Sequence, residues 1–91
     1  MTKKELVKEV AFQTAYNQGQ VAAIISQIEN SIEAALMRGE SVELTGFGKF
    51  EPVDQPARTY RDPHNGGMVS VRAKRRVKFR PGAGLKRAVT G

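Results

Sequence analysis

The sequence has 91 residues, with fifteen Lys and Arg against nine Asp and Glu, and a formal net charge of +6. That length holds one domain, and so small a chain buries so little surface that we expect self-association. The chain has no cysteine and one histidine, which excludes disulfide scaffolds, thiol nucleophiles, Cys-ligated zinc and a multi-His metal site. No apolar run approaches the roughly 20 residues of a membrane span, and the first residues lack the apolar stretch of a signal peptide. We therefore expect a soluble, cytoplasmic protein with no membrane partner and no cofactor.

The basic residues are unevenly distributed. Residues 1–50 hold five bases and six acids, whereas residues 51–91 hold ten bases and three acids. The first part is therefore close to neutral, and all of the basic excess lies in the second. This asymmetry predicts a polyanion-binding element carried on a nearly neutral platform.

The first forty residues are patterned as two helices. Thr2 and Glu5 match a capping box at the start of a helix over residues 2–15. Asn17 suits the N-cap of a second helix, and Gly39 suits the position just after its end. The two helices are predicted to form a helical hairpin. We expect the apolar face of the second helix to be core: Val21, Ile24, Ile25, Ile28, Ile32, Ala35 and Leu36.

After these helices the apolar pattern changes to a period of two. Ser41 to Thr45 alternates as a half-buried strand, and residues 46–50 form a turn into a second strand. Pro52 and Pro56 each remove a ladder donor, so this second strand is expected at a sheet edge or with bulges. The core candidates here are Phe47 and Phe50.

Residues 68–80 are predicted to form a third strand, which carries six bases and no acid. Thirteen extended residues span roughly 43 Å at about 3.3 Å each, whereas a compact domain of this size is roughly 30 Å across. The hairpin should therefore project as an arm, with a turn over residues 62–67 marked by Asn65-Gly66. A short helix follows at about residues 83–89. The alternation places one set of polar and basic residues on one face: Ser70, Arg72, Lys74, Arg76, Lys78 and Arg80.

A basic two-stranded ribbon suits double-stranded DNA. Paired strands lie about 4.8 Å apart, and the minor groove is roughly 6 Å wide. Arg58, Arg61 and the basic face can neutralise phosphates, and Tyr60 offers a stacking surface. Pro63 presents a rigid apolar ring at the predicted tip, where it can wedge between base pairs and kink the duplex.

Three strings carry a resemblance to a known family: GFGKF (46–50), ARTYRDP (57–63) and FRPGAGLKRAV (79–89). They resemble the HU and integration host factor family of bacterial DNA-bending proteins over essentially the whole chain. The resemblance implies an α+β fold with a helical hairpin, a three-stranded antiparallel sheet, a protruding β-hairpin arm and a short C-terminal helix. It implies one domain over residues 1–91, with the helical dimerisation part at about 1–40 and the sheet, arm and last helix at about 41–91.

The resemblance also implies a function. Two chains intertwine, usually as a homodimer, and the arms bend DNA through the minor groove in the bacterial nucleoid. A proline matching Pro63 intercalates at each tip, and further basic positions match near the body. The positions that match the family's DNA-binding residues are Lys3, Arg58, Arg61, Pro63, Arg80 and Lys86. The basic strand and Tyr60, where the family frequently has Gly, add further predicted DNA-binding residues from this sequence itself: Tyr60, Arg72, Lys74, Arg76 and Lys78.

The tip departs from the family pattern, and other functions stay open. Asp62 stands where the family usually has Asn, which should weaken arm binding unless Arg58 or Arg61 pairs with the carboxylate. The close alternative is a subunit with sequence preference, like integration host factor, in a heterodimer. RNA binding is a further alternative, although no aromatic cluster of the usual RNA-binding type is present. An enzyme is disfavoured because no nucleophile, base and metal set converges.

Overall fold

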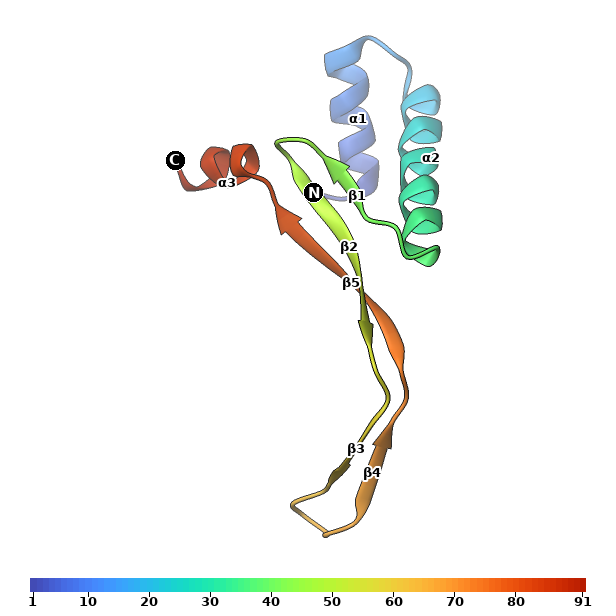
Figure 1. The fold of residues 1–91 in the computed structure, drawn as a ribbon. Coiled ribbons are helices and arrows are strands. Elements are labelled where there is room, and N and C mark those ends of the chain that lie inside the picture. The colour runs from blue at the N-terminus through green and yellow to red at the C-terminus, as the bar shows by residue number, and fades with distance from the viewer. The chain divides into compact units, whose positions relative to one another are not determined.

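The computed structural model describes all residues, Met1–Gly91, and divides into two compact units, Met1–Ala34 and Ala35–Gly91. Three helices and five strands follow one another along the chain (Figure 1). The helices are α1 (Lys3–Thr14), α2 (Gln18–Met37) and α3 (Ala83–Thr90). The strands are β1 (Val42–Leu44), β2 (Gly48–Gln55), β3 (Arg58–Arg61), β4 (Met68–Val71) and β5 (Lys74–Pro81).

In the first unit, α1 and the larger part of α2 form an antiparallel helical hairpin (Figure 1). The hydroxyl of Thr2 accepts a 3.2 Å hydrogen bond from the amide of Glu5, as a capping residue should. Asn17 and Gln20 cap α2 reciprocally, because each side-chain oxygen accepts from the other's main-chain amide at 2.8 and 3.1 Å. Both predicted helix starts are confirmed.

The end of α2 is a Schellman motif centred on Gly39. This residue has a φ of +83°, which a side chain would disfavour. Its amide donates to the carbonyl of Leu36 at 3.0 Å, and the amide of Glu40 donates to the carbonyl of Ala35 at 2.9 Å. The motif stops the helix where the sequence predicted and turns the chain toward β1.

The second unit contains two antiparallel sheets in place of one continuous hairpin. The first has the strand order β1-β2-β5, and the second consists of β3 and β4. β1 covers only the start of β2, from Leu44 opposite Gly48 to Val42 opposite Phe50. Beyond that point one side of β2 is a free edge, which accommodates Pro52 without the loss of a partner.

The turn before β2 packs against the start of α3. The carbonyls of Gly46 and Phe47 accept hydrogen bonds from the amides of Leu85 and Gly82 at 3.2 and 2.7 Å. A Cβ on Gly82 would lie 2.8 Å from the main chain of Gly46, so this approach requires glycine. The GFG and PGAG strings are therefore two sides of one contact.

The isolated chain has very little core. Only four apolar side chains are buried, those of Val7, Val21, Ala35 and Leu36, and no side chain is completely buried. Several residues expected in the core are half exposed, among them Ile24 at 52% and Phe47 at 49%, while Phe12 on α1 is 84% exposed. The rings of Phe50 and Phe79 pack in a tilted arrangement with 4.9 Å between their centroids, but Phe79 is still 40% exposed. These apolar surfaces need a second chain to become a core.

Candidate nucleic-acid interface

The arm consists of two ribbons separated by a short gap. The inner ribbon, β2 with β5, ends at Gln55 opposite Lys74, and the outer ribbon, β3 with β4, begins at Arg58 opposite Val71. Two residues on each strand are unpaired between them, namely Pro56-Ala57 and Arg72-Ala73. The single strand predicted over residues 68–80 is therefore wrong in detail. Pro56 lies in this gap and has no N–H, so the ladder of β3 with β4 cannot continue through it into β2.

The pairing register of the two strands is the same on both sides of the gap. The positions that form the hydrogen-bonded pairs change, from odd-numbered residues on β2 to even-numbered residues on β3. In an antiparallel ladder the directly bonded pairs occur at every second residue. At the end of the inner ribbon away from the tip, the amide of Gly82, just after β5, donates to the carbonyl of Phe47, just before β2. This bond places the hydrogen-bonded positions of β2 at odd residue numbers. At the tip, Asp62 donates to Gly67 at 2.8 Å, which places the bonded positions of β3 at even numbers. The gap thus shifts the phase by one residue.

A phase shift of one residue moves side chains to the opposite face of the ribbon. Arg58 and Tyr60 on the outer ribbon therefore continue the face that carries Lys74 and Arg76 on the inner ribbon. An independent observation agrees with this, because a hollow of about 380 Å³ at the gap is lined by side chains from both ribbons. Its lining residues are Gln55, Pro56, Arg58, Val71, Arg72, Lys74 and Arg76.

The basic face predicted from simple alternation must be corrected. Four of its members share a face of β5: Lys74, Arg76, Lys78 and Arg80. Arg72 lies in the gap, and Ser70 on β4 stands opposite Thr59, on the other side of the ribbon from Arg58 and Tyr60. Alternation in β3 also places Arg61 on the opposite face from Arg58.

The tip is a loop held by its own side chains. The amide of Gly66 donates to the carbonyl of Asp62 at 2.9 Å, and Gly66 has a φ of +70°. Oδ1 of Asp62 accepts from the amide of His64, and Oδ1 of Asn65 accepts from the amide of Gly67. The Asn-Gly signal therefore marks a wider loop rather than a two-residue turn. Pro63 lies within this loop and is exposed.

The predicted basic residues differ in how free their charges are. Lys3 donates to Glu29 at 2.6 Å and to Ser26 at 3.2 Å, and Arg80 pairs with Glu51 at 2.9 Å. The guanidinium of Arg58 lies 5.6 Å from the ring centre of Tyr60, in a cation–π arrangement. No ion pair holds the remaining cations of the set: Arg58, Arg61, Arg72, Lys74, Arg76, Lys78 and Lys86.

Two features of this surface escaped sequence reasoning. Gln55 accepts a 2.8 Å hydrogen bond from Nε of Arg76 and so orients a candidate DNA-binding cation. Glu51 faces both Lys49 and Arg80, at 3.5 and 2.9 Å, although its side chain is only 20% exposed. Both pairings are diagonal contacts across or along the inner ribbon, so they depend on its register. The signal for them in the sequence is only the alternation of β2.

The chain matches a known family over almost its whole length. A sequence profile for the family described as Bacterial DNA-binding protein matches residues 1–90. The chain belongs to the bacterial DNA-binding protein family.

Relatives within this family carry two kinds of name. Integration host factor subunit alpha of Anaeromyxobacter sp. (strain K) is 32% identical over 91 residues, which are 100% of this chain and 80% of that protein. DNA-binding protein HU of Streptococcus downei is 37% identical over 87 residues, or 96% of each chain. The chain in a cocrystal structure of Anabaena HU with DNA is 31% identical, with a TM-score of 0.84 over 98% of this chain and 97% of that one.

The resemblance carried by the three sequence strings is thus confirmed, and so is the α+β fold. The family is one of structural DNA-binding proteins rather than enzymes. None of the three helices of this chain is long and apolar enough to cross a membrane.

Proposed function

We propose that this chain acts as a histone-like, dimeric protein that bends double-stranded DNA with its two arms in the minor groove. Membership of the bacterial DNA-binding family and likeness to HU support DNA binding and bending by a dimer. We place the protein in the cytoplasm, on the nucleoid. The exposed apolar side chains of residues 1–40 are the proposed dimer surface, and residues 41–91 carry all of the proposed DNA contacts except Lys3.

The proposal rests on the cationic surface that the arm forms where its inner and outer ribbons meet. The phase shift at the gap aligns Arg58 and Tyr60 with Lys74 and Arg76, so one face of both ribbons can follow one groove. Cations along this face neutralise phosphates and release counterions, which supplies most of the affinity for DNA of any sequence. Tyr60 adds an aromatic surface that can contact a sugar or base edge.

Pro63 is the proposed wedge. It sits in a loop that Asp62 and Asn65 stabilise through main-chain hydrogen bonds, so its ring is presented by an ordered turn. An apolar side chain inserted between base steps unstacks them and kinks the duplex. The remaining proposed contacts bind phosphates. Arg61 is next to the tip loop, and the others lie farther from it: Lys3, Arg72, Lys78, Arg80 and Lys86.

The test measures binding and bending together. Energy transfer between the ends of a labelled duplex of about 35 base pairs should rise with protein, because free DNA of this length is a nearly straight rod. With six to ten phosphates contacted, affinity should fall about 10³- to 10⁵-fold between 50 and 200 mM salt. Binding without a rise in transfer would mean that the protein coats DNA, and a flat salt response would contradict the electrostatic mechanism.

A second candidate is a subunit with sequence preference, favoured by the likeness to integration host factor subunit alpha. Competition between unrelated duplexes at one salt concentration separates the two. A sequence reader should prefer its site by about 4–10 kcal/mol, whereas a histone-like protein should hardly discriminate.

A further inference from the structure

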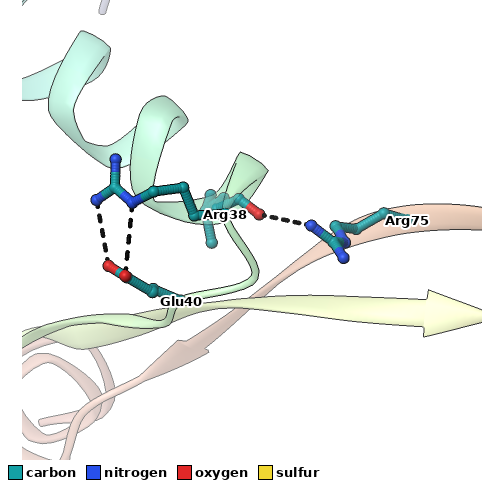
Figure 2. A network of polar contacts seen from close by, with 4 residues as sticks. Arg38, Glu40 and Arg75 are labelled. Atoms are coloured by element: carbon teal, nitrogen blue, oxygen red, sulfur yellow. Dashed lines mark hydrogen bonds and ion pairs between the residues drawn. The ribbon is translucent and has the colours of Figure 1, made fainter.

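Arg75 makes three hydrogen bonds: two reach main-chain carbonyls in the last turn of α2, and one stays within the inner ribbon. Its Nη1 donates to the main-chain carbonyl of Met37 at 2.8 Å, at the end of α2 (Figure 2). The same nitrogen donates more weakly to the carbonyl of Leu36, at 3.4 Å. Its Nε donates to Oδ1 of Asp54 at 2.7 Å. The two carbonyl bonds join Arg75 to residues that come 38 and 39 positions earlier in the chain.

The carbonyl of Met37 needs this donor. The last carbonyls of a helix have no partner within the helix, and the Schellman motif at Gly39 satisfies those of Ala35 and Leu36. No main-chain amide of the motif reaches Met37, so the guanidinium completes the cap. A cation at this end of a helix is also favoured by the helix dipole.

Asp54 fixes the other side of the guanidinium. Asp54 and Arg75 are directly opposite each other on β2 and β5, next to the point where the inner ribbon ends. Bonds from one planar guanidinium to a carboxylate and two carbonyls hold its position in a way that a lysine cannot reproduce. Arg75 therefore holds the outer end of the inner ribbon to α2, just before the unpaired gap.

The neighbouring Arg76 has a different environment. It points to the opposite face of β5, donates to Gln55, and lines the cationic hollow at the gap. The two adjacent arginines therefore have different contacts. Arg75 binds the end of helix α2, and Arg76 lies on the proposed DNA surface.

We propose that Arg75 is a positioning residue that sets the direction of the arm by fixing the inner ribbon to the end of α2. This inference rests on the DNA-bending function proposed above. Without the three bonds, the ribbon can pivot about the loop between α2 and β1, and the two arms of a dimer lose a defined separation. The phosphate contacts themselves are unaffected, because Arg75 is not on the cationic face.

The first experiment needs no DNA. Because the chain has no cysteine, His64→Cys places a single spin label at each tip, and pulsed electron resonance gives the tip-to-tip distance in the dimer. Arg75→Gln should broaden the distance distribution about twofold or more. The matched control Arg76→Gln should leave its width unchanged. Equal widths in all three proteins would overturn the proposal.

The second experiment uses unlabelled proteins and the doubly labelled duplex. Arg75→Gln should lower the energy transfer at saturation while the salt slope of binding stays at the value of the parent protein. Arg76→Gln should reduce that slope by about 1, as expected for the loss of one phosphate contact. A slope reduced by about 1 in Arg75→Gln, with normal transfer, would make Arg75 a DNA contact and contradict a positioning role.

Two further variants keep the proposal testable if Arg75→Gln does not fold. Asp54→Asn removes the charged partner and keeps both carbonyl contacts, so a smaller broadening is expected. Arg75→Lys keeps the charge, and a distribution nearer to that of Arg75→Gln than to the parent supports the geometric argument. If circular dichroism shows that Arg75→Gln is unfolded, an unchanged width in the other two overturns the proposal. A parent protein that fails to bend DNA would instead refute the proposed function, whereas the distance measurement in the free dimer would still test Arg75.

Discussion

The main-chain amide of His64 donates a 2.8 Å hydrogen bond to Oδ1 of Asp62, and this bond shapes the loop that carries Pro63. Neither Arg58 nor Arg61 forms an ion pair with the carboxylate. The acidic residue at the tip therefore supports the turn while its negative charge remains uncompensated beside the proposed wedge.

Replacing Asp62 by Asn separates these two effects. Asn keeps the Oδ1 acceptor but removes the charge, so we expect DNA affinity to rise a few-fold, or by about 0.5–1 kcal/mol, at low salt. Fluorescence anisotropy at two salt concentrations checks this. Asp62→Ala is the control, since it removes both charge and acceptor and should lose part of the gain. An affinity that falls in Asp62→Asn would show that the carboxylate is not a repulsive group.

Pro63→Ala should reduce bending more than affinity. Alanine keeps the loop but lacks the rigid ring that separates base steps, while the phosphate contacts remain. The measurement is energy transfer at saturating protein together with the dissociation constant. Ala57→Gly in the gap is a control that leaves the tip intact. An unchanged bend in Pro63→Ala would remove intercalation from the mechanism.

Glu29→Gln should strengthen DNA binding by releasing Lys3. The 2.6 Å pair between these residues joins two half-exposed side chains, so its loss should change the free energy of unfolding by about 1 kcal/mol or less. A freed Lys3 can neutralise one more phosphate and should raise the salt slope by about 1. Lys3→Gln and the double variant of Lys3→Gln with Glu29→Gln complete a double-mutant cycle for the salt slope. If Glu29→Gln has the same effect in the presence and absence of Lys3, the gain comes from general charge.

Gly82→Ala should destabilise the fold. Its Cβ would lie 2.8 Å from the carbonyl group of Gly46, and a main-chain group in a turn cannot move as a side chain can. Overpacking of this kind costs about 1–3 kcal/mol, and each kcal/mol lowers the melting temperature of a domain this size by about 4–8 °C. Thermal unfolding followed by circular dichroism measures the shift. Gly19→Ala in α2 is the matched control, because its nearest contact is a side-chain oxygen of Asn17 at 3.3 Å.

The local elements could be predicted because their causes are local. Thr2, Asn17 and Gly39 act on main-chain groups within a few residues, so the limits of α1 and α2 follow from capping chemistry alone. The excess of cations after residue 50 likewise indicates a polyanion partner, because charge is a property of composition and does not depend on the fold. The three sequence strings are sufficient to indicate the family.

The tertiary structure decided what depends on pairing between distant residues. Simple alternation assumed one continuous strand over residues 68–80 and therefore placed Ser70 with Lys74 and Arg76. The gap opposite Pro56 shifts the ladder phase, so Arg58 and Tyr60 take that place. The residue pattern of β5 also could not show that Arg75 and Arg76 have different roles. The partner of Arg75, the carbonyl of Met37, is 38 residues away in sequence. The amino-acid sequence by itself determined the helices and the charge, whereas the register and phase of the strands determined which charges act together.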